Sequence, residues 1–111
     1  MLAIAQVETA TAMRNIDAIA AVPGVDMLFL GPNDLRLSLG MRPRPRLEEP
    51  EILAAADTLL AACRKAGVKA GIFCGNPDDA LVMIGRGFDF VTAVIDDVLL
   101  AAGAEIQRRF T

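Results

Sequence analysis

Four short apolar runs alternate with helix-forming segments, and this alternation restricts the fold more than any other feature of the chain. The runs are residues 2–7, 26–30, 68–74 and 88–95. The first is nearly continuous in apolar side chains, as expected for a strand covered on both faces. Strands that alternate with helices form parallel sheets with helical crossovers. The sequence therefore predicts an α/β fold of four consecutive βα units, which fits either a small open sheet or half of an eight-unit barrel.

Capping signals mark the helices between these runs. Residues 51–66 are strong helix formers that follow Pro50 and precede Gly67, which suits the position after a helix. Asn76 and Pro77 have the order of a helix cap and a first helical residue. The remaining segments are a helix that begins at Thr9 or Thr11, a loop or short helical turn over 31–40, an irregular connection over 41–49, and a last helix opened by Asp96-Asp97.

Composition excludes several classes of function. The 111 residues, 54% of them hydrophobic, suffice for one small globular unit. A net charge of −3 gives no general attraction to nucleic acid or to an anionic membrane. The absence of His excludes a His base, a His metal ligand and a Ser-His-Asp triad within this chain. Two cysteines make no disulfide framework, and no apolar stretch reaches the ~20 residues needed to span a bilayer, so a cytoplasmic location is expected.

Two carboxylates follow the first two predicted strands. Glu8 comes directly after the first run, and Asp34 lies just beyond the second, after a break at Gly31-Pro32. The carboxyl ends of parallel strands meet at one edge of a sheet, and adjacent strands lie about 4.8 Å apart. The two carboxylates can therefore reach one ion, and oxygen ligands without His or Cys suit Mg²⁺ or Mn²⁺. Such a metal is a Lewis acid for a carbonyl or carboxylate substrate.

Gln6 precedes Glu8 by two residues, so both side chains point to the same side of the strand. In a barrel that side is the interior, where a Gln and a Glu need polar partners or a ligand. The pattern alone leaves an alternative open. In that alternative Glu8 only favours the start of the next helix, Asp34 caps a turn, and Gln6 belongs to the polar face of an exposed edge strand.

Several motifs together resemble one family. They are Gln6-Val-Glu-Thr9, Val22-Pro-Gly-Val-Asp26 and Leu30-Gly-Pro-Asn-Asp-Leu-Arg-Leu-Ser-Leu-Gly40, and the likeness continues in Gly67-Val-Lys-Ala-Gly-Ile-Phe73 and Gly87-Phe-Asp-Phe-Val91. In combination they resemble the HpcH/HpaI aldolase/citrate lyase family over nearly the whole chain. The resemblance implies that residues 1–111 are a partial domain, strands five to eight of a (β/α)₈ barrel with their helices.

The resemblance also implies an activity and a site. It implies a divalent-metal-dependent lyase that cleaves a 4-hydroxy-2-oxo acid to pyruvate and an aldehyde. By position, Glu8 and Asp34 resemble the metal ligands, and Gln6 resembles the neighbour of the bound 2-oxo group. The backbone N–H groups around Asn33 and Asp34 resemble the cradle for the pyruvate carboxylate. In the family a catalytic His and Arg come from the first half of the barrel, so no catalytic residue is assigned in this chain.

Two other functions stay open beside the aldolase. One is a citrate-lyase-like activity on a CoA thioester, and the other is a catalytically inactive half-barrel that acts as an oligomerising scaffold. A half-barrel exposes strand edges and apolar surface, so we expect a homo-oligomer or a complementary N-terminal half as partner.

For the arginines of this region and for both cysteines we expect structural or solvent-exposed positions. Arg36 stands where the family usually has Ser, and we expect it to project to solvent rather than to meet a second substrate carboxylate. The arginines of the 41–49 connection are expected to be solvated, and Cys63 and Cys74 to be buried.

Overall fold

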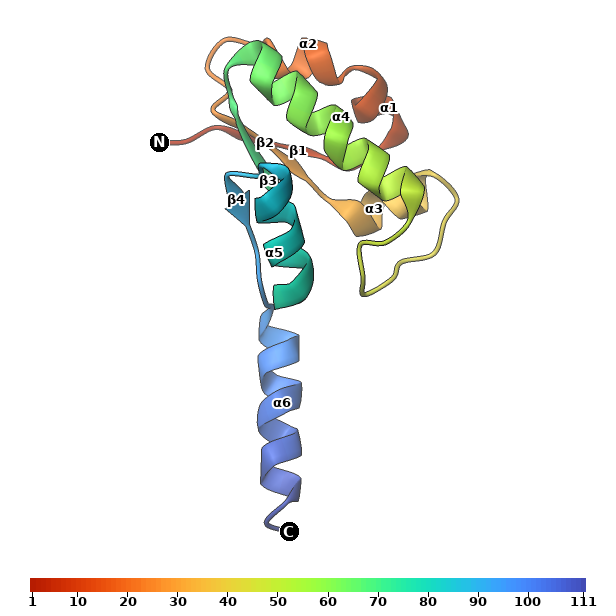
Figure 1. The fold of residues 1–111 in the computed structure, drawn as a ribbon, viewed down its shortest axis with the longest axis vertical. Helices are drawn as coiled ribbons and strands as arrows, with labels where there is room; N and C mark the ends of the chain where they lie inside the picture. The colour runs from red at the N-terminus through yellow and green to blue at the C-terminus, as the bar shows by residue number, and fades with distance from the viewer.

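The computed structural model describes residues 1–111 as four strands and six helices, and the predicted alternation is confirmed (Figure 1). The elements are β1 (Ile4–Val7), α1 (Ala10–Arg14), α2 (Ile16–Ala20), β2 (Met27–Leu30), α3 (Pro32–Ser38), α4 (Pro50–Ala66), β3 (Lys69–Ile72), α5 (Pro77–Arg86), β4 (Phe90–Val91) and α6 (Asp96–Arg108).

The strands form one parallel sheet in the order β1-β2-β3-β4. Val7 pairs with Leu30, Leu30 with Ile72, and Ile72 with Val91. The strands are shorter than the predicted runs because the ends of those runs are extended chain with few ladder bonds. Beyond β3, for example, the Cys74 N–H donates to the Thr92 hydroxyl instead of to a neighbouring strand, at 2.8 Å.

One face of the sheet is covered and the other is open. Leu28, Leu30 and Ile72 are fully buried in a single apolar cluster with residues of α2, α4 and α5. Side chains alternate along each strand, so the intervening residues lie on the opposite face. Ile4 and Phe90 on that face are half-exposed. The open face is the one that carries Gln6.

Local signals account for the helix ends. The Asn76 side chain accepts a hydrogen bond from the Asp79 N–H, as expected for the cap of α5, and Gly67 ends α4 with a φ of 72°. The single helix expected before Pro23 is instead two short helices that meet at Asn15. The Asn15 side chain donates to the Thr11 carbonyl oxygen at 3.1 Å, and such local bonds compete with a continuous helix. Residues 32–38 form a complete short helix, the second of the two forms expected for this segment.

Helix α6 extends away from the rest of the molecule and ends at the C-terminus (Figure 1). None of its side chains is buried within this chain; Leu99, Leu100 and Ile106 are exposed, as is Phe110 just beyond the helix. None of the helices combines the length and apolar character needed to cross a membrane.

Candidate functional site

The ends of β1 and β2 bring the predicted site residues to one edge of the sheet. The Gln6 amide donates to Glu8 Oε2 at 2.7 Å, which confirms that the two side chains share one side of the strand. The Gly31 N–H donates to the Val7 carbonyl oxygen at 3.0 Å and so fixes the first residue after β2 beside the start of Glu8. We call Gln6, Glu8, Gly31, Asn33 and Asp34 the strand-end site.

Gly31 leaves room for the two polar side chains of β1. A Cβ at this position would lie 2.9 Å from Glu8 Oε2 and 3.1 Å from both Gln6 Nε2 and Glu8 Cβ. The backbone at Gly31 has a φ of −101°, which any residue can adopt. A larger residue here would have to displace Gln6 and Glu8, so it is the close approach of these side chains, and not the backbone conformation, that favours glycine.

The first turn of α3 places the other two predicted residues. Pro32 occupies the first helical position, so its missing N–H costs nothing there. Asn33 and Asp34 follow, and their N–H groups have no acceptor within the helix. Asp34 is exposed, and its carboxylate makes no hydrogen bond or ion pair in the chain.

A hollow of about 240 Å³ joins these elements. Its walls are Gln6, Phe29, Gly31, Pro32, Asn33, Asp34 and Phe73. Glu8 is not among these wall residues, but it accepts a hydrogen bond from Gln6, which is one of them. No group of three or more Cys, Asp and Glu residues is close enough to hold an ion by itself.

The donor set fits a hard divalent cation in part. Glu8 and Asp34 offer carboxylate oxygens, and Mg²⁺ is often held by one or two carboxylates with water and substrate oxygens completing the shell. The space that a side chain at position 31 would need is taken by the tips of Glu8 and Gln6, and Glu8 Oε2 accepts the hydrogen bond from Gln6.

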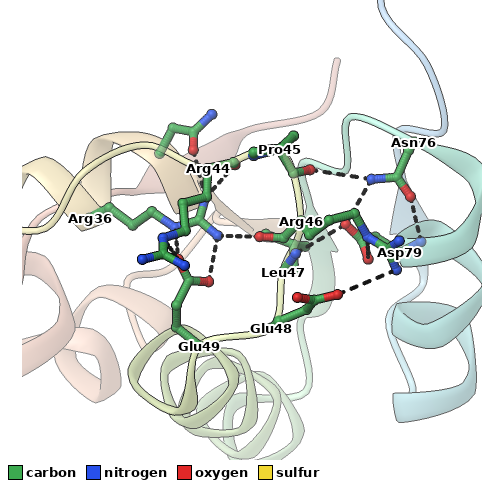
Figure 2. Close-up of polar contacts among 10 residues, drawn as sticks. Arg36, Arg44, Pro45, Arg46, Leu47, Glu48, Glu49, Asn76 and Asp79 are labelled. Atoms are coloured by element: carbon green, nitrogen blue, oxygen red, sulfur yellow. Dashed lines mark hydrogen bonds and ion pairs between the residues drawn. The ribbon is translucent and has the colours of Figure 1, made fainter.

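Arg36 fixes the 41–49 connection to the rest of the protein. The expectation that Arg36 projects to solvent is therefore wrong. Arg36 is 0% exposed, and its guanidinium donates to both carboxylate oxygens of Glu49, at 3.0 and 2.8 Å. It also donates to Asn33 Oδ1 at 2.6 Å and to the carbonyl oxygens of Arg44 and Arg46, at 3.0 and 2.6 Å (Figure 2). We call Arg36 with these acceptors the Arg36 clamp.

Asp79 fixes the same connection from the side of α5. Its carboxylate accepts from Arg46 Nε at 3.0 Å, from the Leu47 N–H at 3.1 Å and from the Asn76 amide at 2.8 Å (Figure 2). Asp79 is 3% exposed and Leu47 is buried. The connection is thus irregular, as predicted, but Arg46 is paired with Asp79 rather than simply solvated.

The pKa shifts follow these contacts. Hydrogen bonds from Arg36 lower the pKa of Glu49 below its ordinary value. Burial raises the pKa of the Cys74 thiol to about 11, so the thiol stays protonated at neutral pH. Cys63 is buried as well, and both cysteines are free, as expected.

A second pocket, of about 200 Å³, adjoins the strand-end hollow. The two cavities share Pro32, Asn33 and Phe73 as wall residues. The second pocket also has Arg44 and Leu47 of the connection in its walls. We did not predict it, because its walls depend on the fixed conformation of an irregular segment.

Comparison with known proteins places the chain in one family. The profile of the HpcH/HpaI aldolase/citrate lyase family matches residues 1–102. The chain belongs to this family. It is 42% identical over 104 residues to the hydroxypyruvate/pyruvate aldolase of Rhizorhabdus wittichii, and the match covers 94% of this chain. It is 38% identical over 112 residues to the 4-hydroxy-2-oxo-heptane-1,7-dioate aldolase of Klebsiella pneumoniae, with all of this chain covered.

The chain spans about two-fifths of these relatives, 41% and 42% of their lengths respectively. Among solved structures, a family member from Burkholderia cenocepacia superimposes with a TM-score of 0.85 at 35% identity, covering 100% of this chain and 43% of that one. The four βα units therefore match about half of a barrel-type aldolase fold, as the resemblance implied.

Proposed function

We propose that this chain forms the metal-binding and pyruvate-binding half of an aldolase that cleaves a 4-hydroxy-2-oxo acid to pyruvate and an aldehyde. In this proposal residues 1–111 correspond to strands five to eight of a (β/α)₈ barrel. The observation that carries it is the pair Gln6 and Glu8, hydrogen-bonded at 2.7 Å and kept accessible by Gly31, next to the unpaired Asp34. The names of the related aldolases support a 2-oxo acid substrate.

The proposal gives each residue of the strand-end site a role. Glu8 and Asp34 would hold Mg²⁺ or Mn²⁺, and the ion would supply a Lewis acid for the 2-oxo group and for the enolate formed on cleavage. Gln6 lines the hollow and donates to Glu8, so its amide would orient Glu8 and border the 2-oxo group. The N–H groups of Asn33 and Asp34, at the start of α3, would donate to the pyruvate carboxylate.

Proton transfer needs a group from elsewhere. The chain has no His, and Cys74, with a pKa of about 11, is a poor base at neutral pH. The open sheet face and the exposed side chains of α6 offer surface for a second copy of the chain or for a complementary N-terminal half-barrel. We infer that activity requires such a partner, which would supply the acid–base residue and cover the half-exposed Phe90.

The missing acid–base group also supports one alternative, an inactive half-barrel that serves as a scaffold. The two functions differ in ligand binding, because a scaffold has no need for a working strand-end site. A citrate-lyase-like activity would instead require a CoA thioester, so malyl-CoA is the competing ligand to compare with pyruvate.

Titration calorimetry with Mn²⁺ in the presence of oxalate, a planar analogue of the pyruvate enolate, tests the proposal. We expect binding by the wild type and at least tenfold weaker binding by Glu8→Gln and Asp34→Asn. Glu105→Gln, which removes an exposed carboxylate of α6, is the matched control and should bind like the wild type. Equal binding by all four proteins, or none by the folded wild type, would contradict the proposal.

A further inference from the structure

We propose that Arg36 is a positioning residue that fixes the Asn33 amide as a hydrogen-bond donor to a carboxylate oxygen of the bound acid. This inference rests on the proposed function, and it adds a side-chain contact that is absent from the roles given above. It is carried by the geometry of the Arg36 clamp and by the place of Asn33 between two cavities.

Every donor of Arg36 has an acceptor. A guanidinium has five N–H groups, and the five hydrogen bonds of Arg36 reach Asn33, Glu49 and the carbonyl oxygens of Arg44 and Arg46. Its side chain is 1% exposed, and its charge is paired with Glu49 at 2.8 Å. Arg36 therefore has no free donor for a ligand, and it can influence a ligand only through the groups it holds.

The bond to Asn33 decides which end of that amide is free. A guanidinium only donates, so the atom 2.6 Å from Arg36 Nη1 is the amide oxygen. The Asn33 NH₂ group then faces away from Arg36, and it makes no hydrogen bond within the chain. Asn33 forms part of the wall of both the strand-end hollow and the second pocket. The two N–H donors of Asn33 are thus unpaired on a residue that lines both cavities, and a carboxylate accepts hydrogen bonds of this kind.

The fixed orientation matters for binding. An Asn side chain that rotates freely must be ordered when a ligand binds, at a cost in free energy. Arg36 removes most of that cost before the ligand arrives. Arg36 also donates to the carbonyl oxygens of Arg44 and Arg46. These bonds fix the connection that forms part of the wall of the adjoining pocket.

A double-mutant cycle on Mg²⁺-dependent oxalate binding tests this inference. We expect Arg36→Lys, which keeps the charge but loses the planar fork, to weaken oxalate binding about fivefold to tenfold, the range of one hydrogen bond. Asn33→Ala should weaken it by a similar factor. In the double variant the second change should add less than about twofold, because Arg36 acts through Asn33. Independent, multiplying effects would overturn the inference.

Side-chain amide NMR separates this inference from the proposed function. The chain has three Asn and two Gln residues, so the spectrum of side-chain NH₂ groups is simple. Arg36→Lys should shift the Asn33 NH₂ signals, whereas Arg86→Lys, an arginine paired with Asp57 on the surface, should not. If wild type binds no oxalate, the proposed function fails while this shift still tests the positioning of Asn33. Unchanged Asn33 signals in Arg36→Lys would overturn the inference by themselves.

Discussion

The strand-end site and the Arg36 clamp lie side by side at the carboxyl edge of the sheet, but their charges are used in opposite ways. In the clamp every donor of Arg36 is paired, and Asp79 nearby accepts three further hydrogen bonds. In the strand-end site Glu8 accepts one hydrogen bond and Asp34 accepts none. Asn33 belongs to both regions, because its amide oxygen accepts from Arg36 and the residue lines the strand-end hollow.

This contrast separates structural from functional charges in the molecule. A buried charge with all its hydrogen bonds made has little capacity left for a ligand, and its removal should cost stability. A carboxylate with free lone pairs at a cavity contributes little to folding, and its removal should cost binding. The predictions below test this division, from the largest expected effect on stability to the smallest.

Arg36→Ala should have the largest effect on folding. The change leaves Glu49, whose side chain is 12% exposed, with only Arg44 at 3.6 Å as a partner, and it removes the donors to two carbonyl oxygens. Breaking a buried pair in this way typically costs about 3–5 kcal/mol. Urea unfolding followed by circular dichroism measures it, and a loss below about 1 kcal/mol would show that the clamp is not structural.

Glu49→Gln should change how stability responds to acid. Arg36 lowers the pKa of Glu49 in the folded state, so its stabilising contribution is complete above the ordinary value of 4.5 and is lost as the pH falls through the lower folded value. The wild type should therefore lose its advantage over the variant below pH 4.5. Unfolding curves between neutral pH and pH 3 check this. A difference in the free energy of unfolding that stays constant over the whole pH range would show that Glu49 does not contribute to the acid response.

Gly31→Ala should affect binding more than folding. The added Cβ would meet Glu8 Oε2 at 2.9 Å and Glu8 Cβ at 3.1 Å, so β1 or the Glu8 side chain must shift. We expect a loss of about 1–3 kcal/mol in stability, typical of overpacking, and at least tenfold weaker Mn²⁺–oxalate binding. Gly103→Ala on α6, where a Cβ meets nothing within 4 Å, is the control. Unchanged binding in Gly31→Ala would show that a small residue at position 31 is not needed for ligand binding.

Asp34→Asn should leave the free energy of unfolding within about 0.5 kcal/mol of wild type, as for a surface residue without partners. Lys65→Gln, which removes an exposed ion pair with Asp17, sets the scale for such surface changes. The same Asp34 variant should lose metal binding. A stability loss above about 1 kcal/mol would place Asp34 with the structural charges instead.

Local signals were enough to predict most of the fold. The cap at Asn76 and the left-handed Gly67 are each determined by neighbours within a few residues, so the sequence indicates them directly. The parallel order of the strands follows from their alternation with helices. The split at Asn15 was missed because side-chain competition with the helix backbone leaves no clear mark in an apolar pattern.

Long-range contacts limited the prediction of the site. The structure brings Gln6, Asn33 and Asp34 to one hollow, whereas Glu8 is outside its walls and is hydrogen-bonded to Gln6. The burial of Arg36 could not be predicted in the same way. Its acceptors lie up to 13 residues away in an irregular connection, and no periodicity relates them to α3. An arginine between two leucines on a short helix is compatible with either solvent or burial.

Paramagnetic broadening by Mn²⁺ in an amide NMR spectrum tests the central claim most directly, because it locates the ion without requiring turnover. With oxalate present, our account predicts that the backbone signal of Gly31 and the side-chain NH₂ signals of Gln6 and Asn33 broaden first. The side-chain signals of Gln107 on α6 should stay sharp, and Glu8→Gln should abolish the selective effect. Broadening that begins at the acidic residues of α6, or that spreads evenly over the chain, would contradict a metal site at the strand ends.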